Sequence, residues 1–147
     1  MASGKHCLFV DTSGWIEVFG VKRDLHKQAN DILTQALEKG RPIITTNYVI
    51  VEFIGTAQKK CGFYYREDLF KAYKEIRNLQ GIEIVHINEK IHAEELTRLR
   101  NWPDKHWSLV DATSFNVMRA LKLTDALAKD GHFNEAGFNE LLGKLPA

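Results

Sequence analysis

The chain has 147 residues, of which 44% are hydrophobic and 27% are charged, and its formal net charge at pH 7 is +1. This length fits one domain, and the composition excludes a disordered chain. No apolar run approaches the ~20 residues of a membrane helix, and the N-terminus lacks the apolar core of a signal peptide. We therefore expect a single domain over residues 1–147, without membrane contact and located in the cytoplasm.

Charge and cysteine content bear on the possible partners of the protein and on a zinc site. The 20 basic and 19 acidic residues nearly balance, which fits a protein without a nucleic-acid partner or one whose basic residues surround an acidic pocket. Cys7 and Cys61 are far apart and form no CxxC pair, so we expect two reduced, packing thiols and no structural zinc site.

The first half of the chain alternates short apolar runs with amphipathic segments. In chain order it is predicted to contain a strand at 6–10, a helix at 24–39, a strand at 42–45 and a helix from 48 to about 60. The first strand ends at Asp11 and turns into a helix, Gly40 ends the second segment, and Thr46 or Asn47 is a suitable N-cap.

The second half continues the same alternation. It is predicted to contain a helix at 65–79, a strand at 82–87, helices at 88–101 and 109–121, a strand at 125–129, and a short helix or edge strand within 133–145. Strands that alternate with helices predict an α/β fold, here a three-layer α/β/α sandwich around a short central parallel sheet.

Acidic residues interrupt this pattern at chemically informative places. Asp11 and Asp130 each follow a predicted strand, and ligands bind beyond the carboxyl ends of parallel strands. Either residue alone is also a suitable turn former. Glu52 lies inside the apolar run VIVEFI, so its carboxylate points outward, pairs with a base, or faces a polar pocket. Asp111 follows Ser108 at the spacing of a capping box, so its carboxylate could cap the start of a helix. The same carboxylate could also present an oxygen to a ligand at that helix end.

Together these residues predict a cation site. The four acids are Asp11, Glu52, Asp111 and Asp130. Carboxylates that converge on one cleft repel each other unless a cation shares the site. Oxygen ligands favour Mg²⁺, Mn²⁺ or Ca²⁺ over zinc, and Mg²⁺ acting on phosphate-bearing substrates is the most frequent use of such a site.

At these residues the sequence resembles the PIN domain family, and within it the VapC-type toxins of toxin–antitoxin pairs. The motifs are FVDTSGWIEVF with Asp11, TTNYVIVEFIGTAQ with Glu52, DKHWSLVDATSFNVMRALKL with Asp111, and DALAKDGHFNEAGF with Asp130. The third motif is the longest and most specific. The chain departs from the pattern at Ala128, where relatives often carry Thr or Ser before the last acid.

The resemblance implies a Mg²⁺- or Mn²⁺-dependent endoribonuclease, the homodimeric toxin of a type II (VapBC-like) system, which hydrolyses RNA with metal-activated water. Asp11 and Asp111 are the expected direct ligands, and Glu52 and Asp130 act directly or through water. Thr12, Ser13 and Ser108 are expected to hydrogen-bond the ligands or their water. A cognate antitoxin is expected to insert a basic side chain, such as Arg, into the cleft.

Alternatives remain at this point. The domain could be a non-catalytic PIN-fold module that binds RNA or a partner, or a related hydrolase of DNA or phosphomonoesters. The RNA could be transfer, ribosomal or messenger RNA. Lys105, Trp107 and Arg119 are candidates for RNA contact, although core or plain surface roles are favoured for each, and His132 is a weaker candidate for the cleft.

Overall fold

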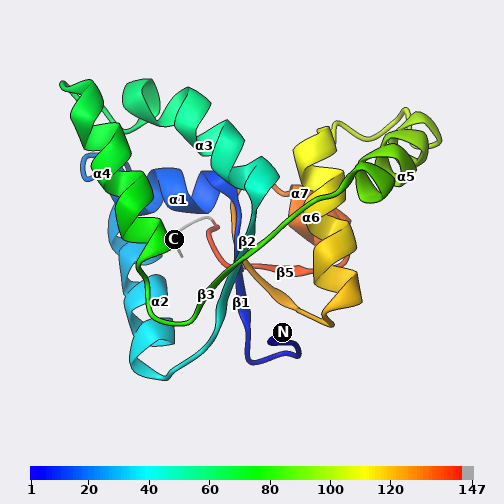
Figure 1. Cartoon of the computed structure of the whole chain (residues 1–147), viewed down its shortest axis with the longest axis horizontal. Helices are drawn as coiled ribbons and strands as arrows, with labels where there is room; N and C mark the ends of the chain where they lie inside the picture. The colour runs from blue at the N-terminus through cyan, green and yellow to red at the C-terminus, as the bar shows by residue number, and fades with distance from the viewer. Residues whose placement is uncertain (144–147) are drawn as a thin grey trace.

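The computed structural model describes residues 1–143, which form a five-stranded sheet in the order β3-β2-β1-β4-β5 (Figure 1). Its strands are β1 Leu8–Val10, β2 Ile43–Thr46, β3 Ile82–Val85, β4 Asp125–Leu127 and β5 Asn139–Glu140. All four neighbouring pairs are parallel, with Leu8 opposite both Ile43 and Asp125. The chain runs outward from β1 to β3 and then returns to β4, so the strand order reverses between β1 and β4.

Helices cover both faces of the sheet. They are α1 Thr12–Phe19, α2 His26–Glu38, α3 Asn47–Lys60, α4 Arg66–Arg77, α5 Glu89–Arg100, α6 Leu109–Ala120 and α7 His132–Glu135. Crossovers between parallel strands are right-handed, so connections that run in opposite directions along the sheet place their helices on opposite faces. Figure 1 shows this, with α1 to α4 on one side and α5 to α7 on the other. The predicted three-layer α/β/α sandwich is therefore confirmed.

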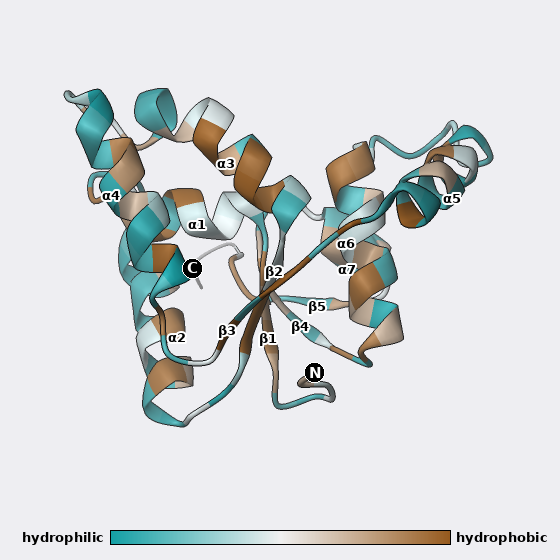
Figure 2. Ribbon diagram, viewed as in Figure 1, coloured by the Kyte–Doolittle hydropathy of each residue, from teal (hydrophilic) through white to brown (hydrophobic). Residues whose placement is uncertain are grey.

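The core forms around the central strand. Every residue of β1 is fully buried, because a parallel sheet is covered on both faces. Figure 2 shows hydrophobic residues along the central strands and hydrophilic residues on the outward parts of the helices. On the α6 side, the Phe9 and Phe133 ring centroids are 6.0 Å apart, and those of Phe115 and Phe133 are 4.9 Å apart. This packing holds α6 and α7 against β1.

The predicted elements are present with shifted boundaries. The strand predicted at 125–129 is wrong at its end, since β4 stops at Leu127. The Lys129 amide donates to a side chain, Ser13 Oγ, and Asp130 has a left-handed φ of 82° that no strand accepts. The tail contains both a short helix, α7, and an edge strand, β5. Residues 144–147 lie outside the described part, so the single domain over 1–147 stays a prediction.

Two further findings bear on the class of protein. Cys7 is buried and Cys61 is half-buried, and both are free thiols, as predicted. Among the described residues, no helix is long and apolar enough to cross a bilayer.

Candidate active site

A cleft of about 400 Å³ opens beyond the carboxyl ends of β1 and β4, where the strand order reverses. Ligands of parallel sheets bind at this kind of position. The cleft is lined by all four acids and by the three predicted hydroxyl residues, Thr12, Ser13 and Ser108. Segments as far apart as residues 11 and 130 therefore meet at one place.

Asp11 is the most buried acid of the cleft, with 7% of its surface exposed. It is the N-cap of α1, and its backbone amide donates to the carbonyl of Leu127 at 3.1 Å, which fixes it beside β4. Its Oδ2 accepts from the Ser13 hydroxyl at 3.0 Å. Burial, followed by repulsion from Asp111, raises the pKa of Asp11 to about 7. A charged Asp11 is thus disfavoured unless a cation joins it.

Ser13 ties the two halves of the site together. While its hydroxyl donates to Asp11, its Oγ also accepts from the backbone amide of Lys129 at 3.1 Å. This links the turn after β1 to the segment after β4. Thr12 also lines the cleft, but its hydroxyl donates to the carbonyl of Val49 in α3 at 3.5 Å and not to an acid.

Asp111 both caps its helix and faces the cleft. Its Oδ2 accepts from the Ser108 amide at 3.0 Å, and the Asp111 amide donates to Ser108 Oγ at 3.0 Å, which completes a capping box. The same Oδ2 lies 2.9 Å from Nδ1 of His132 in α7. Within residues 1–143, Oδ1 of Asp111 and Oδ1 of Asp11 make no hydrogen bond, so each carboxylate keeps one oxygen for a ligand.

The other two acids sit at the rim. Glu52 is half-buried in α3, lines the cleft and has no ion-pair partner within the described residues. Asp130 is exposed and lies in a left-handed bend with Gly131, three residues beyond β4. Ala128, by contrast, is fully buried and does not line the cleft.

Comparison with known proteins agrees with this architecture. The family model described as "PIN domain" matches residues 8–139. The chain belongs to the PIN domain family. It is 30% identical over 134 residues to the 23S rRNA-specific endonuclease VapC20 of two Mycobacterium tuberculosis strains, CDC 1551/Oshkosh and H37Rv. The aligned region covers 91% of this chain and 97% of each relative.

A solved structure shares this PIN fold. The crystal structure of Mycobacterium tuberculosis VapC20, described as a sarcin-ricin loop cleaving toxin, matches with a TM-score of 0.78 and 27% identity over 90% of this chain and 97% of that one. The prediction of a PIN-domain toxin ribonuclease of the VapC type is therefore confirmed.

The PIN-domain cleft also contains charged residues that the motifs did not reveal. Arg23, Lys60 and Lys129 line it together with the acids. Glu17 of α1 is 1% exposed and pairs with Arg23 and, at 3.7 Å, with Lys129 Nζ. The run WIEVF places this acid among apolar residues, which is the signal that singled out Glu52 and could have found Glu17 as well.

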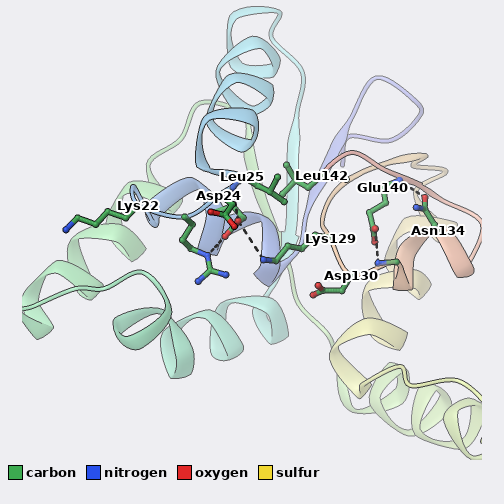
Figure 3. A pocket seen from close by; sticks show the side chains of 12 residues that line it. Lys22, Asp24, Leu25, Lys129, Asp130, Asn134, Glu140 and Leu142 are labelled. Atoms are coloured by element: carbon green, nitrogen blue, oxygen red, sulfur yellow. Dashed lines mark hydrogen bonds and ion pairs between the residues drawn. The ribbon is translucent and has the colours of Figure 1, made fainter. Parts of the chain in front are cut away.

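A neighbouring hollow of about 960 Å³ shares Arg23, Lys129 and Asp130 with the cleft. Figure 3 shows this hollow from close by, with the labelled side chains of Lys129 and Asp130 on its lining. The cleft therefore continues into a groove with cations along its wall. His132 lies in the cleft, whereas Lys105, Trp107 and Arg119 line a separate cavity beside α5.

The donor set of this PIN domain suits a hard divalent cation. In residues 1–143 no three carboxylate, imidazole or thiol groups are already gathered at ligand spacing, so the site is not preassembled. However, Asp11 Oδ1 is fully buried and has no hydrogen-bond partner among residues 1–143. Burial first, and then the charges of Asp111 and Glu52, raise the pKa of Asp11. A buried carboxylate oxygen in this setting needs a positive group, and oxygen donors select Mg²⁺ or Mn²⁺ over zinc.

Proposed function

We propose that this PIN domain is a Mg²⁺- or Mn²⁺-dependent endoribonuclease in which the four acids hold the metal. One observation supports this most: four acids, from the N-cap of α1, from α3, from α6 and from the segment after β4, line one cleft at the strand reversal. Asp11 and Asp111 would be the direct ligands through Oδ1, since the protein already holds Oδ2 of each. Glu52 and Asp130, at the rim, would bind directly or through water.

The chain's own residues prepare the cleft for phosphodiester hydrolysis. A bound divalent cation would neutralise the phosphate and lower the pKa of a coordinated water. Ser13 and the Ser108 capping box hold the two main carboxylates in one orientation, which limits the reorganisation needed when the substrate arrives. Lys129 and Arg23 line the same cleft and offer positive charge to the RNA backbone.

The relative suggests the substrate. VapC20 is a 23S rRNA-specific endonuclease, and its similarity extends over 97% of its length, so we propose ribosomal RNA as the first substrate to test. The acid cluster is also compatible with a hydrolase of DNA or phosphomonoesters, and assays on single-stranded DNA and a chromogenic phosphate ester separate that alternative.

The toxin family also suggests partners. We propose a cognate antitoxin that neutralises the cleft with an arginine, a homodimeric state and a cytoplasmic location. Exposed aromatic side chains at the start of α4 support a protein partner, since Tyr64, Tyr65 and Phe70 are 85%, 65% and 47% exposed. Light scattering of the purified chain tests the dimer, and co-purification with the product of the neighbouring open reading frame tests the antitoxin.

Cleavage assays with matched variants test the proposed function. The purified chain should cut RNA with Mn²⁺ or Mg²⁺ and should lose this activity in EDTA. Asp11→Asn and Asp111→Asn should keep the fold and lose at least ~100-fold in rate. Asp31→Asn is the control, because Asp31 is an exposed acid that only pairs with Lys27 in α2. Full activity in both cleft variants, or cleavage that is independent of metal, would dismiss the assignment.

A further inference from the structure

A cavity of about 320 Å³ lies between α5, α6 and α7, outside the acidic cleft. We call it the tryptophan cavity. Its main lining residues are Glu95, Trp102, Trp107, Phe115, Arg119 and Glu135. Its volume lies within the range of small-molecule sites. The proposed mechanism uses none of these side chains.

Aromatic rings form much of this cavity. The Trp102 and Trp107 centroids are 6.2 Å apart, and Trp107 packs edge-on against Phe115 at 5.2 Å. Trp102 is 47% exposed, although its ring is large and apolar. An indole face that stays in water next to a cavity is suited to stacking against a planar group.

Two buried polar atoms of the cavity lack hydrogen-bond partners among the described residues. Glu95 is 0% exposed, and its Oε2 accepts from Asn116 at 3.3 Å and pairs with Arg98 at 3.2 Å. Among residues 1–143 its Oε1 accepts no hydrogen bond, and its ion pair with Arg119 Nη2 is long, at 4.0 Å. The indole Nε1 of Trp107 likewise donates to no described residue. Such atoms cost stability unless a ligand or water satisfies them.

The charges around Glu95 restrict the ligand. Arg98 and Arg119 already balance this carboxylate, so the cavity needs no further cation. What it lacks is an N–H or O–H donor for Glu95 Oε1 and an acceptor for Trp107 Nε1. A flat, uncharged ring that carries a donor and an acceptor on its edge meets both needs, and nucleobases have this chemistry.

The tryptophan cavity is adjacent to the acidic cleft. Ser108 and Asp111 line the cleft, while their chain neighbours Trp107 and Ala112 line the cavity, so the first turn of α6 separates the two. Lys105 at the cavity lies over the Trp107 ring at 5.7 Å and pairs with Glu135 at 3.7 Å. A strand of RNA that crosses the start of α6 would reach both places.

We propose that the tryptophan cavity binds one unstacked nucleobase of the RNA substrate, with the base stacked on Trp102 and its edge bonded to Glu95 and Trp107. This inference rests on the proposed ribonuclease function. It assigns the cavity a role in substrate affinity and base preference, while the acidic cleft performs the cleavage.

Binding and cleavage measurements together test this proposal. Single-stranded oligoribonucleotides of different base composition are titrated into the cleavage-deficient Asp11→Asn chain, and tryptophan fluorescence is followed. Quenching is expected, and Trp102→Ala should weaken binding roughly tenfold, as loss of one stacked base does. Leu96→Ala is the matched control, because Leu96 is 53% exposed on α5 and does not line the cavity. It should bind RNA normally.

Glu95→Gln tests the base edge in the otherwise wild-type chain. The wild type should prefer one base near the cut, and the variant should lose that preference through KM while kcat stays nearly constant. Unchanged RNA affinity in Trp102→Ala together with unchanged base preference in Glu95→Gln would overturn the proposal, even if the protein cleaves RNA. A fluorescence change that follows protein concentration and not RNA would assign the cavity to a second copy and overturn it too. Absence of cleavage with intact RNA binding would instead contradict the proposed function.

Discussion

The imidazole of His132 lies against the carboxylate of Asp111, with Nδ1 2.9 Å from Oδ2. The two residues belong to α7 and α6, and 21 positions separate them in the chain. The Ser108 amide donates to the same Oδ2, so this oxygen of Asp111 is held from two directions while the residue lines the cleft. His132 is therefore a positioning residue for the proposed metal ligand.

Removal of His132 should weaken metal binding more than it weakens the fold. Residues that orient a ligand typically contribute 10–100-fold in metal affinity, so we expect His132→Ala to raise the Kd for Mn²⁺ by about tenfold. Isothermal titration measures this value directly. His106→Ala is the control, because His106 is exposed and does not line the cleft. Equal Mn²⁺ affinity in His132→Ala and wild type would contradict the positioning role.

Asp11 should make the metal-free protein less stable as pH rises. Its pKa is raised from 3.8 to about 7, so the folded state holds a proton that the unfolded state releases. The unfolding free energy should therefore decrease as the pH rises from about 4 to about 7. Asp11→Asn lacks this titration and removes a charge that burial and then repulsion from Asp111 disfavour. In EDTA at about pH 8 it should therefore melt above wild type, by roughly 3 °C per kcal/mol gained.

Addition of Mn²⁺ should reverse that order, because the cation stabilises only the protein with an ionised Asp11. Differential scanning calorimetry with and without metal gives both results. Asp31→Asn serves as the exposed control and should follow the wild type at every pH. A pH slope that is identical in Asp11→Asn and wild type would show that Asp11 is not the group that titrates.

Gly14 should tolerate no side chain. A Cβ at this position of α1 would overlap the carbonyl oxygen of Leu127 and lie 3.1 Å from Val10 Cγ1, so the helix would have to leave the sheet. We expect Gly14→Ala to lose about 3 kcal/mol or to fail to fold. Gly55→Ala in α3 meets nothing within 4 Å and should gain about 0.5–1 kcal/mol, because alanine favours helix. Urea unfolding of both variants decides the matter, and equal stabilities would refute the close packing of α1 on β4.

Glu17 should stabilise the cleft wall. Its buried carboxylate accepts from the Leu25 amide at 3.3 Å and pairs with Arg23 and Lys129, whose side chains are 31% and 26% exposed. Glu17→Gln leaves these partly hydrated cations without a counter-charge, so we expect a loss of about 2 kcal/mol in unfolding free energy. Glu38→Gln, at an exposed position of α2, is the control. A change within ~0.5 kcal/mol in Glu17→Gln would show that the cations do not depend on it.

Much of the fold and part of the site follow from local patterns. Apolar periodicity predicted the alternation of strands and helices, and the Ser108–Asp111 spacing predicted the capping box that is observed. Asp11 was found because it follows a buried strand, and Glu52 because it interrupts an apolar helix. These signals are readable because each depends on residues within one or two turns of the chain.

The remaining features depend on the strand order β3-β2-β1-β4-β5, which alone brings β4 beside β1. The Lys129–Ser13 hydrogen bond spans 116 positions, and the pair of Glu17 with Lys129 spans a similar length, so no local pattern encodes either contact. Only the tertiary structure shows that Trp107 and Arg119 line a separate cavity and not the acidic cleft. The sequence determined which side chains could carry charge or bind a cation. Long-range packing decided which of them meet, because contacts between distant segments form only when the strands assemble into the sheet.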